Sequence, residues 1–193
     1  MLTKCFLKSG QMNKIETGID DLFVIEPAVF KDSRGYFFES YSKENFKKVG
    51  IDVNFVQDNQ SFSHKGVLRG LHFQIPNKSQ VKLLSVAQGA ILDVAVDIRK
   101  NSSTYGEYSS VLLSEKNKKM FYIGHGFAHG FVTLEDDNIV QYKCSDYYSK
   151  QHEQGLMWND IDLNIDWGID YDPIVSEKDQ DNLFFKNFDS PFV

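Results

Sequence analysis

Between residues 90 and 98 the side chains alternate with the two-residue period of a β-strand. Leu92, Val94 and Val96 fall on one face of that strand, whereas Asp93 and Asp97 fall on the other. Further β-rich stretches, each bounded by a turn-forming segment, lie at 22–30, 36–41, 53–57, 67–74, 81–87, 108–113, 119–124, 127–134 and 138–144. Many short strands at this spacing predict an all-β sandwich or barrel rather than alternating strands and helices.

Two short helices are predicted beside the strands. One has Ser42 as its N-cap and ends at Gly50, and the other begins near Ser176, where the chain has capping-box spacing. The last dozen or so residues are predicted to be a poorly specified tail. Since no repeat or linker divides the chain, we expect one domain over residues 12–193, preceded by an extension at 1–11.

The balance of charge excludes several classes of partner. The 193 residues include 21 basic and 27 acidic side chains, a net charge of −6. A general nucleic-acid or anionic-membrane binder needs a dominant basic face, so we expect neither partner, although a local basic cluster can still hold a small anion. No apolar run approaches the ~20 residues of a spanning helix. Two cysteines make no disulfide framework, and the N-terminal segment is too interrupted by Lys for a signal peptide, so the expected location is the cytoplasm.

Chemically capable side chains are most dense between residues 57 and 74. Arg69 lies in an otherwise apolar predicted strand, where a guanidinium needs either a structural carboxylate or an anionic ligand beside it; the residues alone leave both open. In a regular strand His72 shares one face with Gly70, and Arg69 lies on the other. A strand histidine is more often a core residue than a catalyst, but Lys82 and Asp93 in neighbouring predicted strands favour a functional site.

Three further candidates have ordinary structural explanations. His125 and His129 are four residues apart, about 13 Å on a strand at 3.3 Å per residue, and the chain has no His-x-His motif, so we expect no metal site. Tyr142 follows Val140 on one strand face and could be an interior aromatic whose hydroxyl bonds a carbonyl. Asp179 could simply cap a helix.

A series of motifs nevertheless resembles the dTDP-4-dehydrorhamnose 3,5-epimerase family, the metal-free epimerases of the cupin jelly-roll class. The motifs occur in family order and cover residues 13–182. They are Phe30–Glu39, Gln57-Asp58-Asn59, Arg69–Gln74, Asp93–Arg99, Gly126–Phe131, Tyr142-Lys143-Cys144, Ile165-Asp166-Trp167 and Ser176–Asp179. The resemblance implies a double-stranded β-helix, or jelly roll, with a few short peripheral helices. Two departures are Gly124 in place of a family proline, in a turn that also carries the unassigned His125, and Gly168 in place of another proline.

The same resemblance assigns roles to individual residues. His72 resembles the general base, Asp179 the carboxylate that orients it, Tyr142 the general acid and Lys82 the cation that stabilises an enolate oxygen. Positions that match the substrate-binding residues are Arg34, Glu39, Gln57, Asp58, Asn59, Arg69, His129, Glu153 and Lys178. Because the family exchanges its N-terminal strands in a homodimer, Arg34 and Glu39 are expected to complete the partner's site.

These residue types suit proton transfer beside a ketone. Carbons 3 and 5 of a 4-keto-6-deoxyhexose both flank the carbonyl, so a base of near-neutral pKa can form an enolate at either carbon, and no cofactor is required. The resemblance implies epimerisation of a dTDP-linked 4-keto-6-deoxyhexose at C3 and C5, in dTDP-L-rhamnose biosynthesis for cell-surface polysaccharides. Alternatives are a single-centre epimerase or ketoisomerase acting on a related sugar nucleotide, and a non-catalytic sugar-binding jelly roll.

Overall fold

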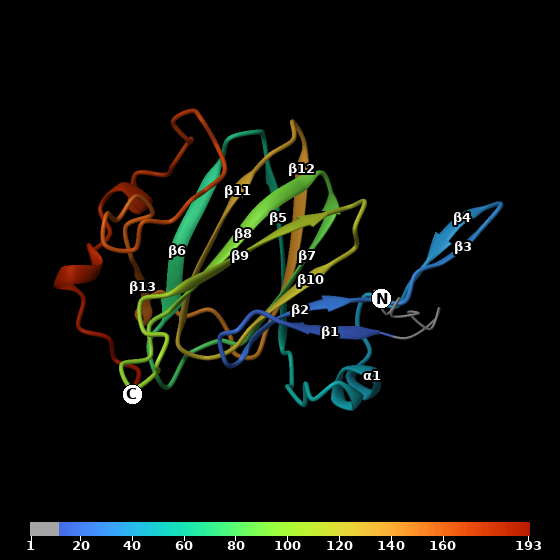
Figure 1. Ribbon diagram of the computed structural model, residues 1–193, viewed down its shortest axis with the longest axis horizontal. Coiled ribbons are helices and arrows are strands. Elements are labelled where there is room, and N and C mark those ends of the chain that lie inside the picture. Colours follow the sequence, from blue (N-terminus) through green and yellow to red (C-terminus); the bar gives the residue numbers. More distant parts are fainter. Residues whose placement is uncertain (1–11) are drawn as a thin grey trace, which may run out of the picture.

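The computed structural model describes residues 12–193, which form two antiparallel sheets that pack face to face (Figure 1). The six-stranded sheet has the order β1 (Asn13–Glu16), β2 (Leu22–Glu26), β10 (Met120–Ile123), β7 (Lys82–Gln88), β12 (Asn138–Cys144) and β5 (Gln57–Ser63). The five-stranded sheet has the order β13 (Glu153–Gly155), β6 (Leu68–Gln74), β11 (Phe127–Thr133), β8 (Ala90–Asp97) and β9 (Tyr108–Ser114). The sandwich and its jelly-roll class are therefore as predicted. The extension expected at 1–11 lies outside the described residues.

Three apolar layers stabilise this sandwich. The central layer lies between the sheets and includes Leu84 and Val140 from one sheet and Ala95 and Phe131 from the other. A second layer covers the outer face of the five-stranded sheet with the C-terminal segment 156–192. A third covers the outer face of the six-stranded sheet with α1 (Lys43–Lys48) and the loop that follows it. Apolar layers therefore cover part of both faces of each sheet. Because the core does not consist of the central layer alone, one end of the space between the sheets can carry polar side chains.

Local signals place the helices. Ser42 is the N-cap of α1, with its hydroxyl accepting from the Asn45 N–H, and Gly50 follows the C-cap with φ +90°. At Ser176 the predicted helix is only a 3₁₀ turn, η1 (Lys178–Gln180), in which the Ser176 hydroxyl accepts from the Asp179 N–H at 3.2 Å. A further 3₁₀ turn, η2 (Phe185–Asn187), lies in the C-terminal segment. No helix among residues 12–193 is long and apolar enough to cross a membrane.

Three sequence-based expectations differ from the structure. The strand expected at 53–57 begins only at Gln57 and runs to Ser63, and the short strands β1 and β13 were not predicted. The poorly specified tail is in fact ordered: Phe192 is buried against Phe73, and its carbonyl accepts from the Lys100 N–H at 3.0 Å. Aromatic side chains spaced along the tail cover the outer sheet face, a function that strand and helix periodicity does not reveal.

The hairpin of β3 (Phe30–Asp32) and β4 (Gly35–Phe37) projects from the body of the molecule (Figure 1). Its aromatic side chains are largely in solvent, with Phe30, Tyr36 and Phe37 exposed by 55%, 57% and 66%. Large apolar side chains clustered on an exposed element indicate a surface that another molecule covers.

Candidate active site

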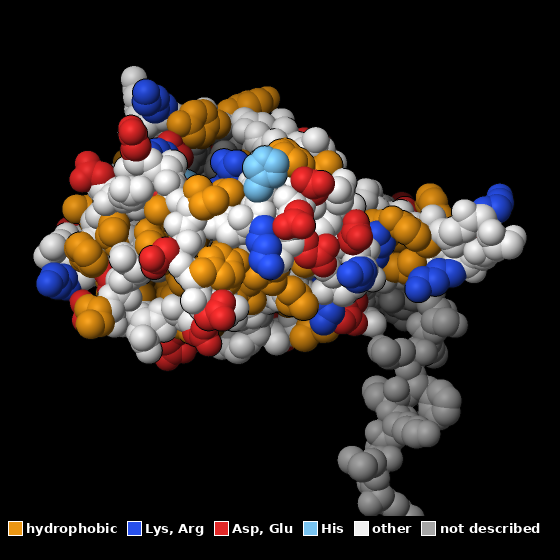
Figure 2. All heavy atoms as spheres, turned by 90° about the horizontal axis from the view of Figure 1, so that it is seen from above, with side chains coloured by type: hydrophobic (Ala, Val, Ile, Leu, Met, Phe, Trp, Pro, Cys, Tyr) orange, Lys and Arg blue, Asp and Glu red, His pale blue; other side chains and the backbone are white. Residues whose placement is uncertain are grey.

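A cavity of about 400 Å³ opens between the two sheets, and side chains from both sheets line it. An adjoining hollow of about 350 Å³ extends toward β13 and the segment after β12. His72, Lys82 and Tyr142 line both spaces and therefore lie where the two meet. Figure 2, a view down on this end of the molecule, shows a hollowed surface on which acidic and basic side chains are mixed.

His72, on β6, pairs with a buried carboxylate. Its ring Nε2 is in hydrogen-bond contact with Asp179 Oδ1, and Asp179 is 3% exposed. Because a carboxylate only accepts, His72 donates through Nε2–H, and Nδ1 is the nitrogen left to take a proton. Burial raises the pKa of Asp179, but hydrogen bonds from His72, Ser176 and the Gly70 N–H outweigh burial and hold that pKa below its ordinary value.

Arg69 lines the same cavity as His72, contrary to the regular alternation expected from the sequence. The pairing of β6 with β11 shifts register between His129 and Phe131, so the chain between Arg69 and His72 does not alternate. Gly70 allows the shift because its φ is +134° and a Cβ there would lie 2.5 Å from Gly130 Cα. Arg69 reaches the opposite sheet, where its Nε donates to Ser63 Oγ at 3.1 Å. No acidic residue described here forms an ion pair with it.

Tyr142 and Lys82 face the cavity from the six-stranded sheet. Burial raises the pKa of the Tyr142 phenol, so the hydroxyl keeps its proton at neutral pH. Burial also lowers the pKa of the Lys82 ammonium, and Cys144, Asp93 and Glu153 oppose that shift. Within the described residues Lys82 has no acidic partner within 4 Å. The site therefore holds a protonated phenol beside a lysine that has no acidic partner among residues 12–193.

His129 lines the cavity and pairs with Asp93, a residue to which the family resemblance gave no role. His129 Nε2 lies 2.5 Å from Asp93 Oδ1, and both residues are buried. Burial lowers the pKa of His129, whereas the Asp93 charge opposes the shift. Asp93 Oδ2 has no hydrogen-bond partner among residues 12–193. On β8, Asp93 shares its face with Ala95, which lies in the central layer between the sheets.

The Gln57-Asp58-Asn59 motif divides between the two faces of β5. Gln57 and Asn59 line the adjoining hollow, and Gln57 Nε2 donates to Asn59 Oδ1 at 3.0 Å. Asp58 lies outside both spaces, on the outer face, where it pairs with Lys143 at 3.0 Å. The two-residue period of the strand separates Asp58 from its neighbours, so the structure does not bring the full triplet to the cavity.

Glu153 and Lys178 do meet at the site. Their side chains form an ion pair of 2.6 Å, with Lys178 at the cavity and Glu153 in the adjoining hollow. Burial raises the pKa of Glu153, but the Lys178 and Tyr148 hydrogen bonds outweigh it and lower the pKa. Tyr148, which the sequence did not single out, lines the same hollow and donates its hydroxyl to Glu153 Oε2 at 2.9 Å. It follows β12 in a segment without regular structure, so no periodicity predicted it.

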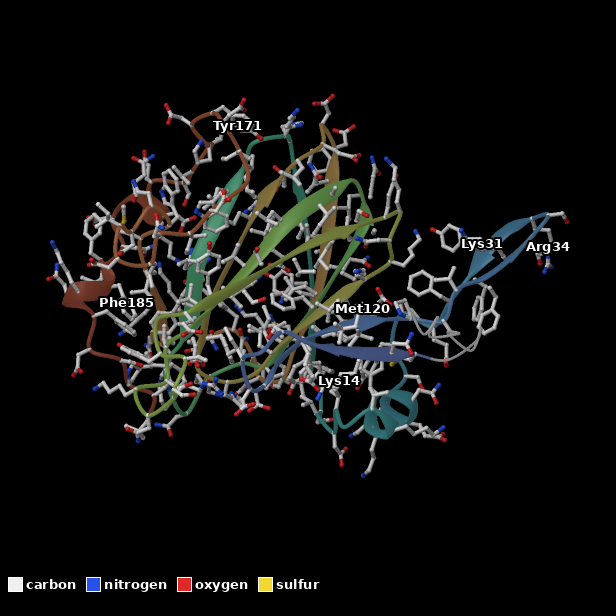
Figure 3. All side chains as sticks on the ribbon, in the orientation of Figure 1. Lys14, Lys31, Arg34, Met120, Tyr171 and Phe185 are labelled. Carbon is white, nitrogen blue, oxygen red and sulfur yellow. The ribbon has the colours of Figure 1, made fainter. Side chains whose placement is uncertain are left out.

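Arg34 and Glu39 lie away from this cavity. Arg34 is at the tip of the projecting hairpin and pairs with Asp32 at 2.6 Å (Figure 3). Glu39 accepts from Asn45 Nδ2 at 2.7 Å and lines a separate depression beside α1. His125, the unassigned histidine, is also outside, with its Nδ1 2.9 Å from Ser79 Oγ. Among residues 12–193 no group of three or more His, Cys, Asp or Glu side chains is placed to hold a metal ion.

Comparison with known proteins extends these observations. The family model described as dTDP-4-dehydrorhamnose 3,5-epimerase matches residues 16–187. An enzyme of that description from Methanothermobacter thermautotrophicus is 51% identical over 168 residues, which span 86% of this chain and 90% of the relative. The crystal structure of dTDP-6-deoxy-D-glucose-3,5-epimerase from Legionella pneumophila, in complex with dTDP-4-keto-L-rhamnose, is 43% identical. It superposes with a TM-score of 0.91 and covers 95% of this chain and 99% of its own.

A 3′-monoepimerase from Streptomyces bikiniensis, solved in complex with dTDP-quinovose, is less similar in sequence. It is 32% identical, with a TM-score of 0.83 and coverage of 88% of this chain and 86% of its own. The fold is thus shared with enzymes that differ in the number of centres they invert, while sequence identity is higher to the 3,5-epimerases.

Proposed function

The chain belongs to the dTDP-4-dehydrorhamnose 3,5-epimerase family, and from this premise we propose how its cavity carries out the reaction. The enzyme epimerises C3 and C5 of dTDP-4-dehydro-6-deoxy-D-glucose and so forms dTDP-4-dehydro-L-rhamnose. One observation carries the mechanism: His72 and Tyr142 come from opposite sheets and line the same cavity, with Lys82 at the same place. Inversion needs a base and an acid on opposite sides of the sugar ring, and this arrangement supplies both.

His72 is the base. With Nε2–H donated to Asp179, its Nδ1 accepts the proton from C3 or C5, and the electron pair of the broken C–H bond moves into the enolate. Asp179 holds the ring in this tautomer and offsets the positive charge that develops on it. The carboxylate is suited to that task because its lowered pKa keeps it ionised at neutral pH.

Lys82 and Tyr142 complete the proton transfer. The enolate places negative charge on the former ketone oxygen, and the Lys82 ammonium, which has no acidic partner within 4 Å in the part of the chain that the structure describes, can stabilise that charge. Tyr142 then donates its proton to the carbon from the face opposite His72, and the configuration is inverted. Its raised pKa favours this role because the phenol remains protonated until the enolate forms.

The remaining side chains bind the nucleotide. Arg69 and Lys178 are cations at the cavity and suit the diphosphate, which Arg can engage with two parallel hydrogen bonds. Gln57, Asn59 and the Tyr148 ring offer amide groups and an aromatic surface for the nucleoside in the adjoining hollow. His129, which also lines the cavity and is held by its pairing with Asp93, offers a further contact to the substrate.

We assign the enzyme to a homodimer that exchanges N-terminal strands, acting in the cytoplasm. Exposed aromatic residues on the β3–β4 hairpin, and the position of Arg34 away from its own cavity, support the exchange (Figure 3). A mixing experiment tests it. Hybrids of His72→Asn and Arg34→Ala protomers contain one cavity with neither change if Arg34 serves the partner, and none if it serves its own chain. Activity that appears only on mixing supports exchange, and its absence refutes it.

Incubation with the 4-keto-6-deoxyglucose nucleotide in heavy water tests the reaction itself. We expect deuterium at both C3 and C5 with the unmodified protein and at neither carbon with His72→Asn. Label at a single carbon would identify a single-centre epimerase. Binding without any label would identify a sugar-binding module.

A further inference from the structure

Residues 145–149 belong to no strand or helix, yet Tyr148 from this segment lines the adjoining hollow. Tyr148, in this segment, is 55% exposed, and its hydroxyl donates to Glu153 Oε2. A ring at the end of an irregular segment keeps its position only if the peptide groups around it are fixed.

Gln74 fixes those peptide groups. This side chain is 5% exposed and lies on β6, two residues after His72. Its Oε1 accepts from the Ser149 N–H at 2.6 Å, and its Nε2 donates to the Tyr147 carbonyl at 3.3 Å. The same Nε2 donates to the Lys78 carbonyl at 2.5 Å, which anchors the amide to a second loop.

Gln57 completes the arrangement from the other sheet. Its Oε1 accepts from the Tyr148 N–H at 3.0 Å, while its Nε2 donates to Asn59. Three consecutive residues are therefore held by two side-chain amides, one from each sheet, and the middle residue, Tyr148, lines the hollow. We refer to Gln57 and Gln74 together as the glutamine clamp.

We propose that Gln74 is a positioning residue for nucleotide binding: through the peptide groups on both sides of Tyr148 it holds that ring at the wall of the hollow. This inference rests on the proposed function, because the hollow is the part of the site assigned to the nucleoside. Gln74 itself touches neither His72 nor Tyr142 through a hydrogen bond, so its loss acts on binding and leaves proton transfer intact.

Only an amide satisfies these partners. Glutamate keeps the acceptor for Ser149 but has no donor for the carbonyls of Lys78 and Tyr147, and methionine fills a similar volume with neither. Three backbone groups lose their partner in the methionine variant, and the segment is free to move away from the hollow.

A double-mutant cycle tests the proposal. The variants are Gln74→Met, Tyr148→Ala and the double variant, with Gln60→Met as the matched control because Gln60 is exposed on the outer face of β5. For each we would measure kcat, KM and the Kd of dTDP by calorimetry. We expect Gln74→Met to raise KM and Kd about tenfold, the equivalent of one to two net hydrogen bonds, with kcat within about twofold. In the Tyr148→Ala background it should add less than about twofold.

The outcomes separate this proposal from the proposed function. An unchanged KM and Kd in Gln74→Met, or the same increase with and without the Tyr148 ring, overturns the glutamine clamp. If Gln74→Met does not fold, the isosteric Gln74→Glu gives the same test, with Kd again expected to rise. Unmodified protein that binds dTDP but incorporates no deuterium refutes the proposed reaction and leaves the clamp measurable through Kd. Unmodified protein that does not bind dTDP overturns both.

Discussion

Asp179→Asn replaces one carboxylate oxygen with an NH₂ group and keeps the size of the side chain. In the protein as it stands the carboxylate accepts from His72 Nε2–H, so Nδ1 is free to act as the base. An asparagine that turns its NH₂ toward the ring donates instead. Nε2 must then accept, the proton of the neutral ring moves to Nδ1, and the nitrogen assigned to proton abstraction can no longer accept a proton.

The size of the effect follows from that change of tautomer. General acid–base catalysis contributes about 10²–10⁴ to a rate, and the same replacement in a Ser-His-Asp triad lowers kcat by about 10⁴. We therefore expect kcat to fall by about 10²–10⁴, or roughly 2.7–5.4 kcal/mol of barrier. KM should change little, because neither Arg69 nor Lys178 depends on Asp179 for a hydrogen bond.

Stability provides a second measurement with a defined sign. The pKa of folded Asp179 lies below the ordinary value of 3.8, so the carboxylate stabilises the fold at pH values above 3.8 and this contribution is lost as the pH falls through the folded pKa. The Asp179→Asn variant lacks this stabilisation at every pH. At neutral pH we expect a loss of about 1–3 kcal/mol, typical of disturbing a buried hydrogen-bonded group, and a weaker dependence of stability on pH below about 4.

The assay combines deuterium incorporation with urea unfolding at pH 7 and pH 3.5. Asp181→Asn is the matched control, since the Asp181 side chain is exposed two residues further along and forms no hydrogen bond or ion pair with a described site residue; the backbone N–H that donates to the Lys178 carbonyl is unchanged by the substitution, so both quantities should stay at the unmodified values. If Asp179→Asn retains more than a tenth of the activity while remaining folded, Asp179 does not set the tautomer of His72, and the proposed base is wrong.

Three further changes have defined outcomes. Tyr142→Phe should retain proton abstraction, seen as deuterium entering recovered substrate, but lose inverted product by about 10²-fold or more, because the protonated phenol is gone; inverted product at the normal rate would exclude Tyr142 as the acid. Lys82→Met should lower kcat by about 10²–10³ without unfolding the protein, as for the removal of one oxyanion donor; a change confined to KM would assign Lys82 to ground-state binding. Gly70→Ala should destabilise the protein by several kcal/mol, ~3 or more, because the added Cβ would meet Gly130 Cα at 2.5 Å with φ at +134°; an unchanged urea midpoint would show that β6 tolerates another path.

The sequence predicted that side chains alternate between the two faces of β8. It did not predict which of these faces points toward the opposite sheet. Val94 and Val96 form the apolar face, and a two-layer sandwich normally turns such a face toward its partner sheet. Here the C-terminal segment covers them instead, and the face with Asp93 and Ala95 points to the interior. The side chains of the tail decide this, and their packing on a distant strand leaves no periodic signal.

The candidate site was predictable where strands are regular and was not where they are irregular. Tyr142 follows the strict period of β12, which places it with Val140 and Cys144 on the interior side. Arg69 joins His72 only because β6 shifts register against β11, an event that depends on the close approach of Gly70 and Gly130. Strict two-residue alternation places Arg69 on the wrong face of β6. The same rule would have placed Asp58 correctly on the outer face of β5, because β5 is regular through the whole Gln57-Asp58-Asn59 motif.

The separation of base and acid is a property of the core rather than of the two residues. His72 stands on the five-stranded sheet and Tyr142 on the six-stranded sheet, and stacked sheets lie about 10 Å apart. Next to the cavity that spacing is set by side chains of the central layer, among them Ala95, Phe131 and Val140. Ala95 is fully buried and lies two residues after Asp93 on β8. A larger side chain at this position would push the sheets apart or displace the His129–Asp93 pair. The rate of proton transfer falls steeply as the distance between donor and acceptor grows. A larger side chain at Ala95 should therefore reduce turnover although every catalytic side chain is still present.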